Sequence, residues 1–445
     1  MNMFKPTLMA TAAVIALTGC SVFKNLGKTD TDPTLDKAGR VNMSIADQKL
    51  TPDADLAGVT VTIPPPTAVK DWPQEGVTPD KMTGNIEAGQ DFKIEWRVTV
   101  GQGSNLQKRL VAPPVVGEGK LFVIDANQRV SAFDPATGRH IWSKQLTALH
   151  KKDKTAIGGG VAVLGDKLLV SSGFGFVTAL SVADGKEIWK QRTDSPLSSA
   201  PAVIGTRAYV TSTDNQVYAI DTDTGAIVWS DQAIAESARI LSSPSPAVNN
   251  ELLVAPYSSG ELIAYLPANG RRLWQDTLTT IGRFTPLSAI NDIAGHPTIE
   301  NGVVYAASHS GVLTAIDARS GQRLWAILFG SRLGPVLAGD YLFIVGTEGE
   351  VACIQKVDGK IVWVRNLPEF KKVKQKKGRI VWTGPLIASN RLIVTSSEGN
   401  VLALSPQTGQ TEAELKVGGD ILIQPIAAGG LIYALTDKGQ LVAIK

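Results

Sequence analysis

The feature that most constrains this chain is a trio of residues repeated at one spacing: a small residue, a glycine six positions later and a tryptophan four positions after the glycine. The glycines of successive copies lie 38 to 51 residues apart. A strand-rich repeat of this length is typical of a β-propeller. The copies are Ala132/Gly138/Trp142, Ala179/Gly185/Trp189, Ala219/Gly225/Trp229, Ala264/Gly270/Trp274, Ala315/Gly321/Trp325, Cys353/Gly359/Trp363 and an incomplete Ala403/Gly409 with Ala413 in place of tryptophan.

One copy of the repeat predicts four antiparallel strands. In the third copy, residues 201–230, runs of Val, Ile, Tyr and Thr alternate with Gly, Asp and Asn, as in consecutive strands joined by turns. Gly225 falls in the last turn, where glycine adopts a positive φ without steric cost. Asp134, Asp221 and Asp317 recur at one repeat position, so we expect them to stabilise this turn through bonds to its backbone. Such sheets bury their faces by stacking around an axis.

The repeat therefore predicts an all-β, eight-bladed β-propeller of four-stranded antiparallel blades over residues 90–445. Seven copies are complete in their strands, whereas the eighth ends at Lys445 one strand short. The segment from Phe92 to Val98 contains Trp96, which stands before the first copy as each other tryptophan stands before the next. We expect this N-terminal strand to close the last blade, because closure removes exposed sheet edges.

The first residues are predicted to be a lipoprotein signal peptide, residues 1–19. A charged start is followed by the apolar run Leu8 to Leu17 and then by Thr18-Gly19-Cys20, as in a secretory signal. The run is too short to span a bilayer as a helix. The Leu-Thr-Gly-Cys order resembles the lipobox of bacterial lipoproteins, which implies cleavage before Cys20 and acylation of this residue. By the same resemblance to enterobacterial lipoproteins, Ser21 after the cysteine implies localisation in the outer membrane. The alternative is an ordinary signal peptide with a chance cysteine.

Residues 20–89 are predicted to hold the lipidated cysteine and a flexible tether. The segment is rich in Thr, Asp, Lys and Pro and shows no sustained period, a composition that buries little apolar surface. The alternative is that part of it, around Trp72, packs on the propeller.

Composition excludes several kinds of function. The net charge of +3 gives no reason to expect a nucleic-acid partner. The four histidines and two cysteines show no metal-binding spacing, and the chain lacks a nucleophile elbow and a P-loop. We therefore predict no catalytic residue, no metal and no cofactor, and we expect the chain not to be an enzyme.

Interruptions of the repeat are the better candidates for a site, because loops on rigid scaffolds carry function. Two long insertions, residues 230–243 and 277–295, mix apolar residues with Arg and acids, as protein interfaces do. The basic run from Lys371 to Arg379 is either a solvated connector or a contact for an acidic partner or anionic lipid headgroups.

The motif AxDxxTGxxxW, found here at residues 219–229, resembles the tryptophan-docking repeat of quinoprotein dehydrogenases. Together with the lipobox and the length, the chain is similar to the BamB family, the β-propeller lipoproteins of the outer-membrane β-barrel assembly machinery. The resemblance implies a non-catalytic scaffold, anchored in the outer membrane by lipid and facing the periplasm. It also implies binding to the POTRA domains of BamA, alongside other lipoproteins of the complex.

The resemblance also implies where BamA is bound. Arg239, Ile240 and Leu241 occupy the loop that carries an apolar-Arg run in the family, although their order differs from its Leu-x-Leu-Arg. Asp292 matches the first acid of the family's Asp-x-Asp pair, and Ala294 replaces the second.

Two rival functions remain open on sequence grounds. One is a pyrroloquinoline-quinone-dependent dehydrogenase, although the adjacent cysteines found in many such enzymes are absent here. The other is a periplasmic binding or lectin-like propeller that uses its central funnel, although no ring of aromatic residues other than the docking tryptophans recurs. Fold alone does not decide among them.

Overall fold

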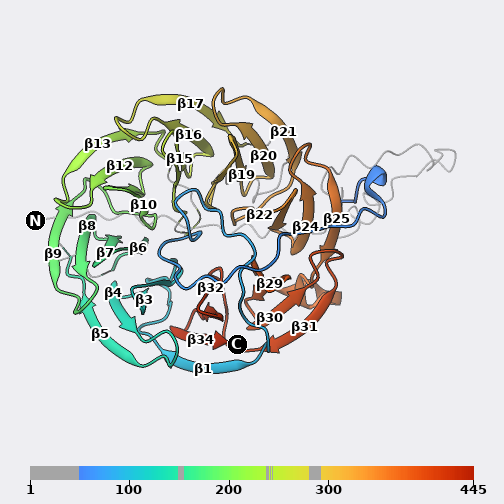
Figure 1. Ribbon diagram of the computed structural model, residues 1–445, viewed down its shortest axis with the longest axis horizontal. Helices are drawn as coiled ribbons and strands as arrows, with labels where there is room; N and C mark the ends of the chain where they lie inside the picture. The colour runs from blue at the N-terminus through green and yellow to red at the C-terminus, as the bar shows by residue number, and fades with distance from the viewer. Residues whose placement is uncertain (1–49, 149–154, 237–239, 241, 243, 280–291) are drawn as a thin grey trace, which may run out of the picture. The chain divides into compact units, whose positions relative to one another are not determined.

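The computed structural model describes residues 50–148, 155–236, 240, 242, 244–279 and 292–445. Within the compact unit from Lys49 to Lys445, four-stranded antiparallel sheets follow one another around a ring (Figure 1). Eight such sheets are present among the described residues, which confirms the predicted eight-bladed propeller. None of the helices in this part of the chain is long and apolar enough to cross a membrane.

The blades are numbered in chain order, and each runs from an inner strand at the channel to an outer strand at the rim. Their strands are β2 (Val115–Gly117), β3 (Lys120–Ile124), β4 (Arg129–Phe133) and β5 (His140–Gln145) in blade 1; β6 (Gly159–Leu164), β7 (Lys167–Ser172), β8 (Phe176–Ser181) and β9 (Glu187–Arg192) in blade 2; β10 (Ala202–Ile204), β11 (Arg207–Thr211), β12 (Gln216–Asp221) and β13 (Ile227–Gln232) in blade 3; β14 (Ala247–Val248), β15 (Leu253–Pro256), β16 (Glu261–Tyr265) and β17 (Arg272–Thr277) in blade 4; β18 (Thr298–Glu300), β19 (Val303–Ala307), β20 (Val312–Asp317) and β21 (Arg323–Leu328) in blade 5; β22 (Val336–Ala338), β23 (Tyr341–Val345), β24 (Glu350–Gln355) and β25 (Ile361–Asn366) in blade 6; β28 (Trp382–Ala388), β29 (Arg391–Ser396), β30 (Asn400–Leu404) and β31 (Thr411–Lys416) in blade 7; and β32 (Ile426–Ala428), β33 (Leu431–Leu435), β34 (Gln440–Ile444) and β1 (Ile94–Thr99) in blade 8. Outside the blades lie the short 3₁₀ helices η4 (Ala54–Leu56) and η5 (Val373–Gln375) and the hairpin β26 (Phe370–Lys372) and β27 (Lys377–Arg379).

The N-terminal strand closes the ring as expected. β1 pairs antiparallel with β34, with Trp96 opposite Ala443 and Val98 opposite Leu441. The last blade is therefore built from both ends of the propeller, in the order β1-β34-β33-β32. This arrangement confirms the closure predicted from the position of Trp96.

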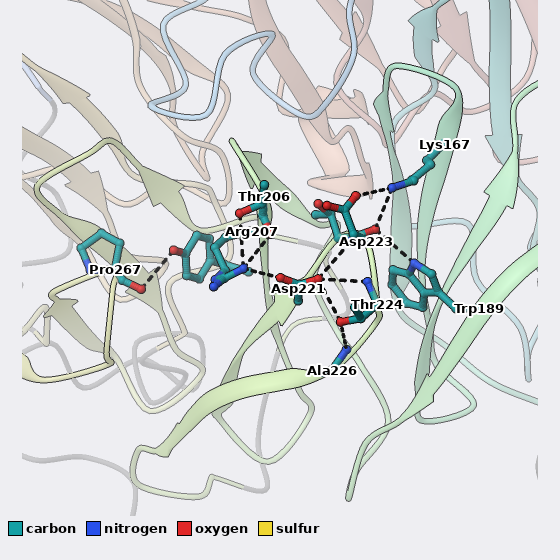
Figure 2. A network of polar contacts seen from close by, with 11 residues as sticks. Lys167, Trp189, Thr206, Arg207, Asp221, Asp223, Thr224, Ala226 and Pro267 are labelled. Carbon is teal, nitrogen blue, oxygen red and sulfur yellow. Dashed lines mark hydrogen bonds and ion pairs between the residues drawn. The ribbon is translucent and has the colours of Figure 1, made fainter.

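In blades 1, 3 and 5 the turn before the outer strand is stabilised by the recurring aspartate. In blade 3 the Asp221 carboxylate accepts hydrogen bonds from the backbone N–H and the hydroxyl of Thr224, both at 2.9 Å, and pairs with Arg207 (Figure 2). Gly225 follows with φ +77°. Asp134 and Asp317 accept equivalent bonds from Thr137 and Ser320. The predicted structural role of these acids is confirmed.

Each tryptophan joins its blade to the next one. The Trp189 ring lies on Gly225 of the following blade, and its indole N–H donates to the Thr222 carbonyl at 3.1 Å (Figure 2). The same contact with the following glycine recurs for every other docking tryptophan, namely Trp96, Trp142, Trp229, Trp274, Trp325 and Trp363. The small residue of each trio lies directly opposite the tryptophan in the sheet, as Ala219 does opposite Trp229. Each blade therefore supplies the tryptophan for its contact with the next blade and the glycine for its contact with the preceding blade.

The missing tryptophan at Ala413 has a structural reason. Its blade precedes blade 8, where the strand pair β34 and β1 is formed by the two ends of the propeller. No chain turn joins these two strands, so blade 8 offers no turn glycine on which a tryptophan could dock. The repeat is incomplete at the one position where its partner does not exist.

Gly225→Ala is expected to destabilise the propeller more than an alanine at an open glycine. The new Cβ would lie 2.6 Å from the Trp189 ring, in addition to the strain of φ +77°. We expect a loss of about 1 kcal/mol from the backbone and roughly 1–3 kcal/mol more from overpacking. Gly205→Ala is the matched control, because Gly205 has φ +55° and nothing within 4 Å of its new Cβ. Equal unfolding free energies for the two variants, measured in denaturant, would contradict the docking contact.

Residues 50–89, expected to be part of a flexible tether, instead form a strap that packs against the ring. Figure 1 shows this blue segment crossing the centre of the ring. Trp72 and Ile86 are buried, and they join a hydrophobic cluster with residues of blades 1, 7 and 8. The alternative considered for Trp72 is therefore what the structure shows, and the tether prediction no longer holds for residues 50–89.

The strap contacts every blade, mostly near the end of the inner strand. Because inner strands leave one edge unpaired toward the channel, these bonds satisfy backbone groups that would otherwise lack partners. Its partners are Val116 (bound by Trp72), Val163 (by Pro73), Val203 (by Gln74), Val248 (by Pro79), Ile299 (by Asp80), Ile361 (by Asp53), Ile387 (by Ile86) and Gly429 (by Val69), in blades 1 to 8 respectively.

The predicted signal peptide at residues 1–19, the lipidation site Cys20 and the rest of the expected tether, residues 20–49, lie outside the described residues. They remain predictions from the sequence.

Candidate partner-binding site

The two long insertions leave the rim at neighbouring positions of the ring. The first connects β13 to β14, and the second connects β17 to β18. The described ends of both connections lie on the face where the outer strand of one blade passes to the inner strand of the next, which we call the connection face. The ends of the two insertions therefore leave adjacent blades on the same face.

The structure brings two of the predicted site residues together. The backbone N–H of Ile240 donates a hydrogen bond of 2.6 Å to the Asp292 carboxylate. The bond ties the first insertion to the second across 52 positions of sequence. Arg239 and Leu241, which flank Ile240, lie outside the described residues, so their side chains are not placed.

Asp292 is not an exposed acid of the kind expected at a partner surface. It is only 4% exposed, and its backbone carbonyl accepts a 2.9 Å hydrogen bond from the His309 N–H. Its charge also acts on Arg332: burial lowers the pKa of this guanidinium, and the negative charge of Asp292 opposes that shift. Asp292 is therefore placed to fix the position of the Ile240 backbone.

The start of the first insertion is anchored separately. The Ile234 N–H donates to the Glu261 carboxylate at 2.9 Å, and the Ile234 carbonyl accepts from the Asn215 side chain at 2.7 Å. With its backbone held in this way, the Ile234 side chain remains 65% exposed. Sequence reasoning did not single out Ile234, although an isoleucine between two alanines in a polar connection was a usable signal.

A hollow of about 470 Å³ lies beside the site, along the channel of the ring. It is lined mainly by residues that precede inner strands, among them Arg109, Ile240, His296 and Arg332, and by Glu75 of the strap. A second, smaller hollow shares Ile240, Ser242 and Pro244 with the first. Ile240 thus borders two recesses, which is a suitable position for a residue that contacts an inserted side chain.

Three titratable groups are buried close to one another: Glu75 and Lys81 of the strap, and His296, which precedes blade 5. Burial lowers the pKa of Lys81 and raises that of Glu75, while the opposite charges of the two groups limit both shifts. The Lys81 ammonium donates to the Glu75 carbonyl at 2.9 Å and to the Ser245 hydroxyl at 3.0 Å. Burial, and then the charge of Lys81, lower the pKa of His296 to about 4. His296 is therefore neutral at ordinary pH.

The candidate site has the chemistry of a recognition surface. It presents an exposed isoleucine, a backbone fixed by a buried carboxylate and two recesses on a rigid ring. In the part of the chain that the structure describes, no three His, Cys, Asp or Glu side chains are grouped as metal ligands. The fold defines a tryptophan-docked, eight-bladed propeller, and its connection face carries the candidate site.

Comparison with known proteins gives the family. The family described as "Outer membrane protein assembly factor BamB" matches residues 89–152, 126–365 and 369–445, and this chain belongs to it. A relative with that name from Bordetella pertussis is 27% identical over 361 residues, covering 80% of this chain and 88% of the relative.

Solved structures confirm the fold. The crystal structure of BamB from Moraxella catarrhalis has a TM-score of 0.64 at 18% identity, and the match covers 78% of this chain and 99% of that one. The quinohemoprotein alcohol dehydrogenase from Comamonas testosteroni also has a TM-score of 0.64, at 15% identity, over 88% of this chain and 82% of that enzyme. At these identities the likeness concerns the fold alone.

Proposed function

We propose that this chain is a non-catalytic scaffold lipoprotein of the outer-membrane β-barrel assembly complex. In this proposal it is anchored through Cys20, faces the periplasm and binds the POTRA domains of BamA with its connection face. Family membership supports the assembly role. The dehydrogenase alternative is supported only by the shared fold, which does not imply a shared activity.

The observation that carries the binding site is the hydrogen bond between Ile240 and Asp292. It holds one insertion against the other, so the loop that contains Arg239, Ile240 and Leu241 meets its partner with less conformational entropy to lose. Arg and large apolar side chains dominate the energetics of protein interfaces. We therefore assign direct contact with BamA to these three residues and a positioning role to Asp292.

Arg239→Glu combined with Ile240→Asp is expected to weaken binding of BamA by roughly 30-fold or more, because loss of a central anchor costs about 2 kcal/mol or more. Titration of the purified POTRA domains of BamA measures the effect. Arg319→Glu with Val357→Asp is the matched control, because it makes the same chemical changes at exposed turns before outer strands, away from the connection face. Unchanged affinity of the first double variant, or equal loss in both, would refute this site.

Asp292→Asn tests the positioning role. Replacement by arginine would place a cation beside Arg332, so the neutral amide of the same shape is the informative change. We expect weaker binding of BamA with little change in melting temperature, and the loss should be smaller than for the Arg239 and Ile240 double variant.

A further inference from the structure

The hairpin between blades 6 and 7 carries an unusual concentration of positive charge. Residues 371–379 include five lysines and one arginine and no acid. All nine residues are exposed, on a hairpin formed by β26, η5 and β27. It is a ribbon of regular structure rather than an irregular connector, so its charges project together.

Only the base of this hairpin is neutralised. Lys371 pairs with Glu398 at 2.5 Å, and Arg379 lies 3.6 Å from Glu348, so the two ends are held to neighbouring loops. Toward the tip, Lys372, Lys374, Lys376 and Lys377 have no ion pair with any residue that the structure describes. These four lysines and the apolar Val373 between them form what we call the basic tip.

The basic tip is unfavourable in the isolated protein. Lys372 and Lys377 are direct cross-strand partners, and like charges placed directly opposite destabilise a hairpin. Val373 at the tip is 70% exposed, so its apolar side chain is available to a partner. An anionic surface with an apolar layer beneath it would neutralise the lysines and accept the valine.

The position of the hairpin on the ring also favours an anionic membrane surface. The strap reaches the rim on β25, where the Asp53 N–H donates to the Ile361 carbonyl at 2.8 Å. The far end of this six-residue strand leads directly into the hairpin, so the two points are separated by roughly 20 Å of strand. The first described residues of the strap therefore join the ring on blade 6, whose outer strand leads into the basic tip.

We propose that the basic tip binds the anionic phospholipid headgroups of the membrane surface, with Val373 entering the interfacial layer. The proposal rests on the proposed lipid anchor for its setting, because the anchor would hold the chain near the membrane surface. It sets the ring with blade 6 toward the bilayer and leaves the site at Ile240, in the connection between blades 3 and 4, free for a protein partner.

The test uses the full chain with Cys20→Ser, so that acyl groups do not mask weaker binding. Co-sedimentation is measured with phosphatidylcholine vesicles that contain about 30 mol% phosphatidylglycerol and with pure phosphatidylcholine vesicles. We expect binding to the anionic vesicles at low salt that is lost near 0.5 M salt, where charges are screened within about 4 Å. Changing the four tip lysines to Gln should reduce the partition coefficient roughly 100-fold or more.

The matched control changes Lys70, Lys120, Lys144 and Lys438 to Gln, which removes the same charge from other parts of the ring. It should bind vesicles nearly as the unsubstituted chain does. Equal binding by the tip variant, or no preference of the unsubstituted chain for anionic vesicles, would overturn the proposal. So would a tip variant that binds vesicles normally but no longer binds BamA, which would assign the hairpin to an acidic protein partner.

The two proposals fail separately. The Arg239→Glu and Ile240→Asp variant should lose BamA and keep vesicle binding, whereas the tip variant should lose vesicles and keep BamA. Val373→Asp, which keeps all four lysines, should weaken vesicle binding by a smaller factor, and an unchanged melting temperature will show that these variants remain folded.

Discussion

Deletion of residues 92–98 is expected to leave little soluble, folded protein. The segment contains most of β1, whose pairing with β34 completes blade 8. Its loss exposes the edge of β34, removes Trp96 from Gly138 of blade 1 and opens the ring at one seam. We expect a decrease of more than about 5 kcal/mol in the free energy of unfolding, which is comparable with the whole stability of a small domain. Thermal melting and soluble yield measure the effect.

Deletion of the seven residues 371–377 is the control of equal length. They belong to the exposed hairpin outside the blades and contribute nothing to the closure of the ring. This deletion should leave the melting temperature nearly unchanged. If the chain without residues 92–98 melted at the same temperature as the intact protein, closure by β1 would not stabilise the ring.

Trp72→Ala is expected to lower the free energy of unfolding by about 3–5 kcal/mol, as for other buried tryptophans replaced by alanine. Trp72 is 3% exposed, and its backbone exchanges two hydrogen bonds with Val116 of blade 1, at 2.7 and 2.8 Å. We also expect the strap to become sensitive to proteolysis, because its anchor on blade 1 is lost. Denaturant titration and limited proteolysis with mapping of the cleavage sites test both effects.

Trp72→Phe separates the contribution of the apolar indole surface of Trp72 from that of its N–H group. The indole N–H of Trp72 is buried and has no hydrogen-bond partner among the described residues. Phenylalanine keeps most of the apolar contact and removes this unpaired donor, so it should cost much less than alanine. Leu106→Ala, at a residue that is 97% exposed, should have no effect. Similar losses for Trp72→Ala and Leu106→Ala would contradict a structural role of the strap.

The propeller was predictable because its repeat encodes a contact between consecutive blades. The trio Ala219, Gly225 and Trp229 fixes one strand pairing, one turn and one docking position, and the same geometry returns in each copy. The closing strand was predictable for the same reason, since Trp96 occupies a position that only an outer strand can fill. Periodic patterns of this kind are the most reliable signal in a single sequence.

The strap was missed because its contacts have no period. It bonds to every blade, in several cases through backbone groups of residues such as Pro73 and Pro79 whose side chains give no pattern. Its composition resembles that of a disordered segment, yet it needs little apolar surface because the ring supplies unpaired backbone partners. Only Trp72 indicated from the sequence that part of it would be buried.

The site was predictable only in part. Sequence spacing placed Ile240 and Asp292 in neighbouring insertions, but the burial of the Asp292 carboxylate depends on the path of a loop. A carboxylate that fixes a backbone and one that contacts a partner look the same in a sequence. Likewise, the exposure of Ile234 follows from the way Glu261 and Asn215 hold its backbone.

The alanine at position 413 makes one join of the torus mechanically different from the others. Between blades 7 and 8 no tryptophan packs on a turn of the next blade. The strap crosses this join instead, with Ile86 bonded to blade 7 and Gly89 to blade 8. Rupture of the torus under heat or force would begin at this join once the strap detaches. The strap, which follows the proposed lipidation site in the chain, would then also be the segment whose release separates the two ends of the propeller.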